Sequence, residues 1–547
     1  MIAFGLLIPL AMLGAVIAGV AALAKRNEEE PPDGFVRRIV VAGLTFGMTI
    51  VLALGLFTLL DIAFSSFDDE IFRSGSADMA RALAMTIVGG PAAYALWRYQ
   101  LRVLSGPDGR SIVWLLHQAI ASATFSIGTV IALGNGIRPT DFDAGARSSL
   151  AFAVAWGAAW LFHEWVRTRH PAPILPGLAQ AIAGGVGLIT VAFGGVALFA
   201  ALFGQIERDV IASTGRPIIA AAVWLAIGAA VWAWQFLTKP DLDRWSRAAL
   251  VLGVGVGGGA LLALGGATLL ATLLLGTITD GLEWEEVGGA LGAVAVGSLI
   301  WRYHHGLSRD PEGQRVGRHL VSGLSLIGLA VGVGVLVNYG LAALTPAFAG
   351  RNEDELLWAG LAAVLVNGPV WWFAWRPDRR PDPDAGSVVQ RTYLTLLGGV
   401  AGVVGAVALI YLAFQLIEGI LDGDSAGTIV DAIRAPLGFV VATAAVTGYH
   451  YRRWAASRVH QEPVTLERVT FVGPDEVADS IRRDLGVRVT RWASAGEGRV
   501  LGAGDLAQHL RDLDAVDVLV VEENGGYRVV RLLRNDDQRP HTGPPQE

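Results

Sequence analysis

Few side chains inside the apolar stretches of this sequence have chemistry of their own. Four polar residues within long apolar runs can exchange hydrogen bonds or touch a polar ligand: His117, Gln180, Asn338 and Asn367. A fifth, Gln118, stands directly after His117. No aspartate, glutamate, lysine or arginine stands clearly at the centre of a run. A transporter that couples to protons or ions is expected to carry at least one such charge. The scarcity of central charges therefore argues against a coupled transporter.

Helix packing is the interpretation we favour for these four residues, with contact to a substrate as the alternative. His117 lies within two turns of the inner end of its run, which indicates a place near the membrane interface. Asn338 and Asn367 are suited to hydrogen bonds between helices, which are worth about 0.6 kcal/mol on average. Asn367 also precedes Pro369 by two residues, where backbone groups freed by proline need partners.

The sequence contains no other recognisable catalytic or metal-binding motif. The chain has no cysteine, which excludes a thiol nucleophile or a thiolate metal site. His304 and His305 are adjacent, so on one helix they point about 100° apart and do not share a metal readily. The glycine run at 253–259 lies inside an apolar stretch, without the strand that precedes a phosphate-binding loop. We therefore predict no catalytic residue, no cofactor and no metal site.

The elements that carry these residues are predicted to be membrane spans. Of 547 residues, 53% are hydrophobic and only 17% are charged, and the mean hydropathy is +0.49. Crossing a hydrocarbon core takes about 20 apolar residues, and many windows of that length carry no charge. After a first helix at Met1 to Ala24, twelve spans are predicted at 39–64, 80–97, 111–134, 148–165, 177–204, 217–237, 247–277, 287–303, 319–345, 356–375, 392–417 and 429–450.

The loops between these spans alternate in charge. Every second loop is rich in arginine, as at Arg98, Arg102 and Arg110, and the others are richer in acid, as at Asp68 to Glu70. Since lysine and arginine near span ends face the cytoplasm, we predict a cytoplasmic-membrane protein with its N-terminus outside and its C-terminus in the cytoplasm. The lipid bilayer is therefore an expected partner.

One helix-end signature recurs and defines a repeat. Thr86 to Arg98 and Val364 to Arg376 both place a Gly-Pro pair before aromatic residues and a Trp-Arg pair. The signature residues are Gly90, Pro91, Trp97 and Arg98, and again Gly368, Pro369, Trp375 and Arg376. We expect the aromatics to lie at the membrane interface and the arginines to reach the headgroups. The chain then begins with a membrane anchor helix (1–26). The helical hairpins that follow group into three four-helix units at 35–169, 174–306 and 315–453.

This hairpin pattern resembles DUF5671, a domain of unknown function in bacterial membrane proteins built from helical pairs. The resemblance is carried by the two signatures and extends over most of residues 35 to 455, as three copies of a four-helix unit. It implies an architecture, and it supplies no activity, substrate or catalytic residue.

The chain changes character after Arg453. Residues 462–535 are charged and alternate between strand and helix periodicities, which predicts a small cytosolic α+β domain. The fold class is thus an all-α polytopic membrane bundle of about 13 transmembrane helices with that domain at its end. Residues 536–547 are polar and contain proline, and we expect a disordered tail.

The function that fits best is a non-enzymatic scaffold or sensor, whose 462–535 domain binds a protein partner. The alternative is an uncoupled transporter or channel for a neutral or apolar substrate, and a membrane-embedded enzyme ranks third. No nucleic-acid partner is expected, and the oligomeric state is open.

The predicted topology has a direct test. Reporter fusions at Glu353 and at Arg380 should fall on opposite sides of the membrane, with Arg380 in the cytoplasm, because the acidic and basic loops alternate. Alkaline phosphatase and fluorescent-protein fusions at the two positions measure this. The same reporter active at both positions would contradict the span count.

Overall fold

The computed structural model describes residues 32–532 except for several segments, and the predicted anchor (1–26) and tail (536–547) lie outside it. The omitted segments are 66–75, 138–143, 173–174, 207–214, 239–241, 278–282, 309, 343–353, 376–387, 460–467, 473–474, 493–505, 507–509, 512–516 and 524–525. The chain divides into two compact units, Met1–His450 and Tyr451–Glu547, which we describe separately.

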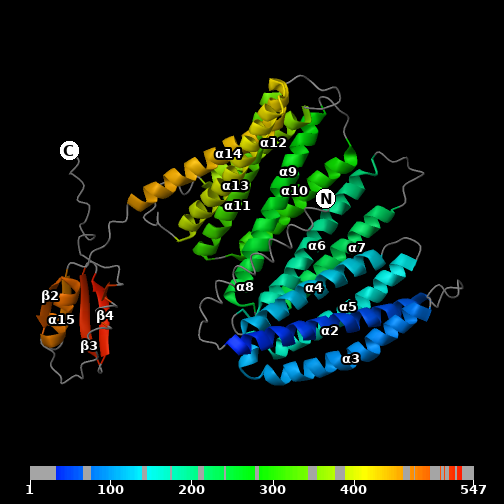
Figure 1. Cartoon of the computed structure of the whole chain (residues 1–547), viewed down its shortest axis with the longest axis horizontal. Helices are drawn as coiled ribbons and strands as arrows, with labels where there is room; N and C mark the ends of the chain where they lie inside the picture. The colour runs from blue at the N-terminus through cyan, green and yellow to red at the C-terminus, as the bar shows by residue number, and fades with distance from the viewer. Residues whose placement is uncertain are drawn as a thin grey trace, which may run out of the picture. The chain divides into compact units, whose positions relative to one another are not determined.

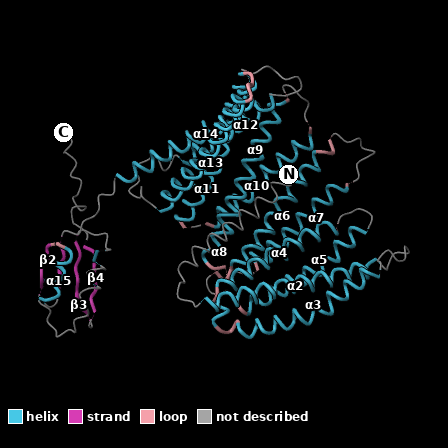
Figure 2. The backbone as a smooth tube through the Cα atoms, in the orientation of Figure 1, coloured by secondary structure: helices cyan, strands magenta, loops and turns pink. Residues whose placement is uncertain are grey.

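The first unit is built from long helices, and Figure 2 shows helix through nearly all of its described residues. These helices are α2 (Pro32–Ser65), α3 (Ser76–Val103), α4 (Ile112–Gly136), α5 (Ala144–Arg169), α6 (Leu178–Phe203), α7 (Arg216–Trp232), α8 (Arg244–Ala248), α9 (Gly259–Gly276), α10 (Trp284–Leu307), α11 (Pro311–Ala342), α12 (Asp354–Trp375), α13 (Val388–Leu421) and α14 (Ala426–Val459). A short 3-10 turn, η1 (Pro107–Arg110), and two π-helical segments, η2 (Ala233–Leu237) and η3 (Ala249–Gly258), complete the set.

Each of the twelve predicted spans within the described residues coincides with a helix or a helix with its π segment. Ten of these are long and apolar enough to cross a membrane. The other two are α5 and α10, of 26 and 24 residues. Both carry charges near their ends, such as Glu164 in α5 and Arg302 in α10, which lowers their overall hydropathy.

Consecutive helices pair as hairpins, and the hairpins join through a few of their members (Figure 1). The pairs α2–α3, α4–α5, α6–α7, α9–α10 and α11–α12 pack along their lengths. In the first two groups of four, the first helix also packs on the last, α2 on α5 and α6 on α10. Contacts of α4 with α6 and of α9 with α12 join one group to the next.

Glycine lets the helices of a hairpin approach backbone to backbone. In α6–α7, a Cβ on Gly187 would lie 2.6 Å from the backbone nitrogen of Trp232, and one on Gly228 would lie 2.5 Å from that of Val191. The hairpin α9–α10 repeats this with Gly259, whose Cβ would lie 2.6 Å from the backbone nitrogen of Trp301. Small residues at such crossings let van der Waals contact drive association, since lipid is as apolar as the helices.

Two aspartates connect loop segments to neighbouring helices through hydrogen bonds. Asp108 in η1 accepts hydrogen bonds from Arg37 and Arg38 at the start of α2, each with a contact of 2.8 Å. Asp243 caps α8 by accepting from the backbone of Ser246 at 3.0 Å, and it also accepts from the backbone of Gly177 at 2.9 Å. Partial burial acts to raise the pKa of Asp243, but hydrogen bonds, first from Ser246, outweigh it and leave that pKa below its usual range.

The second unit contains a four-stranded sheet. Its elements are β1 (Arg468–Val472), α15 (Asp475–Leu485), β2 (Arg488–Trp492), β3 (Asp517–Glu523) and β4 (Gly526–Leu532). The strand order is β2-β1-β3-β4, with β1 parallel to β2 and β3 and with β4 antiparallel to β3. Phe471 and Val520 of the sheet and Ile481 of α15 are fully buried in one apolar cluster. Gly486, at φ +66°, ends α15 in the left-handed conformation that glycine adopts most easily.

Substitution of glycine tests the hairpin contacts. We expect Gly187→Ala to destabilise the bundle by about 1–3 kcal/mol, because its new methyl group meets the Trp232 backbone, which does not give way. Gly265→Ala on α9 is the matched control, since nothing lies within 4 Å of its Cβ position. It should be neutral or stabilising by about 0.5–1 kcal/mol. Unfolding midpoints in detergent, followed by circular dichroism, measure both, and equal midpoints would contradict the contact.

Candidate functional site

Three helices of the first unit carry an aromatic residue followed by a buried histidine in their C-terminal halves. The dipeptides are Phe162-His163 in α5, Tyr303-His304 in α10 and Tyr449-His450 in α14. In each, the two rings meet edge to face, with centroids 5.9, 5.0 and 5.3 Å apart. The histidines are only 8%, 1% and 1% exposed. The same local arrangement thus recurs in three places along the chain.

Each of these histidines is hydrogen-bonded through one ring nitrogen and not through the other. The Nδ1 atoms donate to the carbonyl four residues earlier, those of Ala159, Ile300 and Val446, at 2.8 Å in each case. A carbonyl only accepts, so Nδ1 carries the proton and Nε2 presents a lone pair. None of the three Nε2 atoms has a hydrogen-bond partner within the described part of the chain. A buried polar group without a partner costs about 1–3 kcal/mol, so each needs an explanation.

His304 shows how the local backbone makes room for such a ring. A Cβ on Gly255 in the π-helical segment η3 would lie 2.3 Å from Cγ of His304. Gly255 therefore lies at a helix contact, as Gly259 does against Trp301, whereas nothing lies within 4 Å of the Cβ positions of Gly253 and Gly258. The other neighbours of the His304 ring are Trp232, Phe236 and Tyr303.

His163 has a second histidine beside it. His117 of α4 is 5% exposed, and its ring centroid lies 5.7 Å from that of His163. Its Nε2 also lacks a partner among the residues described, while its hydrogen bond goes to the backbone of Ala42 in α2. The His117 side chain lies inside the bundle, between α2, α4 and α5, and its expected level near the membrane interface stays a prediction.

Aromatic rings enclose the two histidines. Trp97 of α3 meets both edge to face, at 5.6 Å from His117 and 5.2 Å from His163. Trp114 stacks on His117 at 5.2 Å, and Phe125 stacks on His163 at 4.9 Å. The indole of Trp97 is fixed by donating from Nε1 to the Thr49 hydroxyl at 2.9 Å. We call His117, His163 and these three rings the histidine box.

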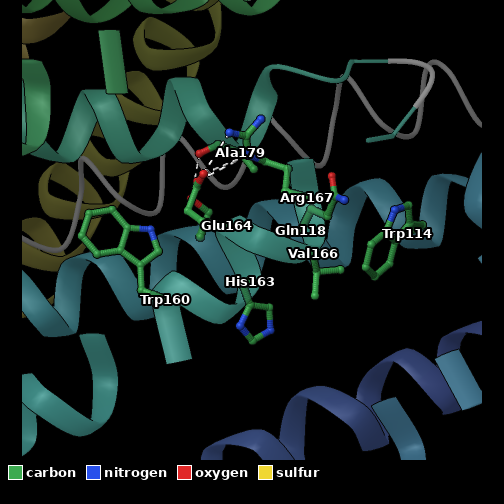
Figure 3. Close-up of a pocket in the computed structure, with 9 residues that line it drawn as sticks. Trp114, Gln118, Trp160, His163, Glu164, Val166, Arg167 and Ala179 are labelled. Carbon is green, nitrogen blue, oxygen red and sulfur yellow. Dashed lines mark hydrogen bonds and ion pairs between the residues drawn. The ribbon is translucent and has the colours of Figure 1, made fainter. Parts of the chain in front are cut away.

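A small crevice opens beside the histidine box (Figure 3). Its lining residues are Trp114, Gln118, Ser122, Trp160, His163, Glu164, Val166, Arg167 and Ala179. Glu164 and Arg167 form an ion pair of 2.9 Å at its wall, with side chains only 7% and 10% exposed. In Figure 3 the His163 ring points away from this pair. Because Ala179 belongs to α6, the crevice lies where the first two groups of helices meet.

A related cluster lies at the corresponding end of α11 to α14. Trp375 donates from Nε1 to the Tyr449 hydroxyl at 2.5 Å and stacks on Tyr393 at 5.0 Å. The Tyr393 ring lies 4.9 Å from that of His319 and 5.7 Å from that of His450. Aromatic and imidazole rings therefore gather here as well.

The signature residues of the sequence fall partly inside the protein. Trp97 and Trp375 are 6% and 0% exposed, so both side chains lie inside the bundle, and their level relative to the membrane interface stays a prediction. Their indole N–H groups have partners on other helices, and this allows burial. Pro91 and Pro369 lie within α3 and α12. The remaining signature residues are Gly90, Arg98 and Gly368, which lie on those same helices, and Arg376, which lies outside the described residues.

The other polar residues singled out in the sequence make separate contacts. Gln180 donates to the Gln235 carbonyl at 2.6 Å, in the π-helical segment η2. Asn367 donates to the Thr268 hydroxyl of α9 at 3.1 Å, a bond between helices of the expected kind. The side-chain oxygen of Asn338 is buried without a described partner. These residues lie on three different helices and do not form a common site with His117.

Sequence reasoning missed His163, Glu164 and Arg167. The recurring aromatic-His dipeptide was the available signal, because it stands in the C-terminal half of the last helix in each predicted four-helix unit. No group of three or more histidine, cysteine, aspartate or glutamate side chains is placed to hold a metal within the described residues.

The buried ion pair should be coupled more strongly than an exposed one. A double-mutant cycle with Glu164→Gln and Arg167→Met is expected to give a coupling energy of about 1.5–3 kcal/mol, because both partners are desolvated. The matched control is Asp78 with Arg81, a pair of the same spacing on α3 with side chains 51% and 66% exposed. Its coupling should be about 0–1 kcal/mol. Detergent unfolding of the single and double variants measures both, and equal values would contradict the burial.

Comparison with known proteins identifies one segment. Residues 315–445 match the family model described as Domain of unknown function (DUF5671). No similar protein was found among curated proteins and no similar structure among solved ones. The matched residues run from α11 into α14 and include His319, Trp375 and Tyr393, and they fall within the third four-helix unit expected from the sequence. The segment from α11 to most of α14 is therefore a match to DUF5671, a family whose function is not known.

Proposed function

We propose that this protein is a scaffold or sensor of the cytoplasmic membrane and not an enzyme. Its helices form thirteen spans in three four-helix units, with the N-terminus outside. The second unit of the chain lies in the cytoplasm as an α+β module and binds a protein partner.

The observation that carries the proposal is the way the helical interior is filled. Backbone contacts at Gly187 and Gly228 leave no space between α6 and α7. Aromatic rings fill the space around His163 and around Trp375. The crevice beside the histidine box is small and local, and neither Asn338 nor Asn367 lines it. Such packing suits a rigid support better than a path for a solute.

The three-unit arrangement has independent support. An aromatic-His pair lies in the C-terminal half of α5, α10 and α14, the last helix of each proposed unit. Each histidine donates from Nδ1 to the carbonyl four residues earlier. The hairpins α6–α7 and α9–α10 share the same glycine contacts. A third line of support is the family match over α11 to α14.

The module has features of an interaction domain. Its sheet buries Val469, Phe471 and Val520 against α15, so its core is its own. β2 and β4 are edge strands, since each pairs with one neighbour only in the sheet order. Edge strands and loops of such a sheet are surfaces that protein partners commonly use.

Deletion of residues 462–547 tests the proposal. Full-length and truncated proteins, both tagged at the N-terminus, are cross-linked in cells and captured. We expect one or more protein partners with the full chain and their loss with the truncated one, while both insert in the membrane equally. Phe471→Asp, which breaks the core of the module, should act like the deletion, and Arg482→Ala on its exposed surface serves as the matched control.

The contrary outcomes are specific. The same partners captured by full-length and truncated proteins would refute the module's role. Solute flux through reconstituted vesicles that depends on the bundle alone would favour the uncoupled transporter or channel.

A further inference from the structure

Two buried lone pairs share the histidine box. His117 and His163 are 5% and 8% exposed, and neither Nε2 atom has a hydrogen-bond partner among the described residues. Their ring centroids are 5.7 Å apart. A buried acceptor that meets no donor points to an absent water or ion, and here two such acceptors come from two different helices.

Both rings are held in the form that binds metals. His163 donates from Nδ1 to the Ala159 carbonyl at 2.8 Å, and His117 is bonded to the backbone of Ala42. Metal-ligating histidines almost always donate their other ring N–H to a carbonyl or carboxylate, which fixes the tautomer and the ring. The fixing bonds are thus already present on both rings.

The spacing also suits a bridging ion. Metal–imidazole bonds are about 2.0 Å long, so one ion between two rings holds the two nitrogens about 4 Å apart. Because each nitrogen lies at the edge of its ring, a centroid separation of 5.7 Å is of the size that such a bridge needs.

The surroundings select the charge and type of the ion. Both donors are neutral, and the neighbouring carboxylate of Glu164 is paired with Arg167. Burying a divalent ion among neutral ligands costs much free energy, and burying a monovalent ion costs less. Trp97, Trp114 and Phe125 offer ring faces and edges around the pair, and aromatic faces attract cations. Imidazole is a ligand that suits copper. Monovalent copper also forms two-coordinate complexes with neutral nitrogen donors.

We propose that His117 and His163 bind one monovalent copper ion through their two Nε2 atoms. The crevice lined by His163, Gln118 and Trp114 lies beside this pair of histidines. This site is independent of the proposed scaffold function.

Anaerobic titration with Cu(I) tests the site. Full-length protein in detergent micelles competes with a chromophoric Cu(I) chelator, and X-ray absorption reports the ligands. The chain has no cysteine, so no thiolate competes for the ion. We expect one Cu(I) per chain, held by two nitrogen ligands, and binding weakened at least about tenfold in His117→Gln and in His163→Gln.

His304→Gln is the matched control. It removes a histidine with the same Nδ1 bond and the same partnerless Nε2, but the ring contacts of His304 are with Trp232, Phe236 and Tyr303 and not with a second histidine. Its Cu(I) affinity should equal that of the natural protein. If a glutamine variant fails to fold, the phenylalanine variant replaces it, because it keeps a ring in the box without a nitrogen.

The proposal is overturned by any of three results. These are no binding above the micelle blank, binding in both histidine variants that is as tight as in the natural protein, and sulfur ligands from methionine in place of nitrogen.

Discussion

The helices of the first unit depend on how closely their backbones approach. In a membrane the hydrophobic effect does not drive helix against helix, so contact area, hydrogen bonds and small side chains must do so. At the crossings near Gly187 and Gly228 and near Gly259, the two helix backbones are so close that the methyl group of an alanine would not fit. Everything else in the bundle, including which side chains face each other at the helix ends, follows from these crossings.

Close approach has a consequence for the polar groups that lie inside. Thr49 and Ser325 donate back to a carbonyl of their own helix, and the indole of Trp97 donates across to Thr49. Such donors are satisfied locally, which is what a medium without water requires. Other buried groups have no partner among the described residues, both donors, such as the indole N–H groups of Trp160 and Trp232, and acceptors, such as the Nε2 atoms of His117 and His163.

The helical part of the fold could be read from the sequence with some accuracy. Apolar length alone located α2 to α14, because about 20 residues are needed to cross the membrane and the loops are short and charged. The match of residues 315–445 to DUF5671 confirms the resemblance for the segment that holds the second signature, Val364 to Arg376, and the copies expected within residues 35–306 stay a prediction. The π-helical segments were not foreseen, since a run such as Gly253 to Gly259 fits either helix type in its pattern.

The candidate site was harder to predict for a physical reason. His117 and His163 are 46 positions apart by number and on different helices, and only the rotation of α4 and α5 about their axes brings the rings together. Hydropathy gives the length of a helix and says little of its rotation. The burial of Trp97 was not predicted either, because it depends on a partner on another helix, the Thr49 hydroxyl, which accepts from the indole N–H.

The two nitrogens of the histidine box differ in when they become available. His163 donates from Nδ1 to the Ala159 carbonyl within α5, so its tautomer is fixed as soon as that helix forms. His117 bonds to Ala42 of another helix, so its tautomer is fixed only when α2 and α4 meet. One half of the pair is therefore a product of secondary structure and the other half a product of assembly. A group that recognises both nitrogens together would in effect read out whether the first four helices have come together.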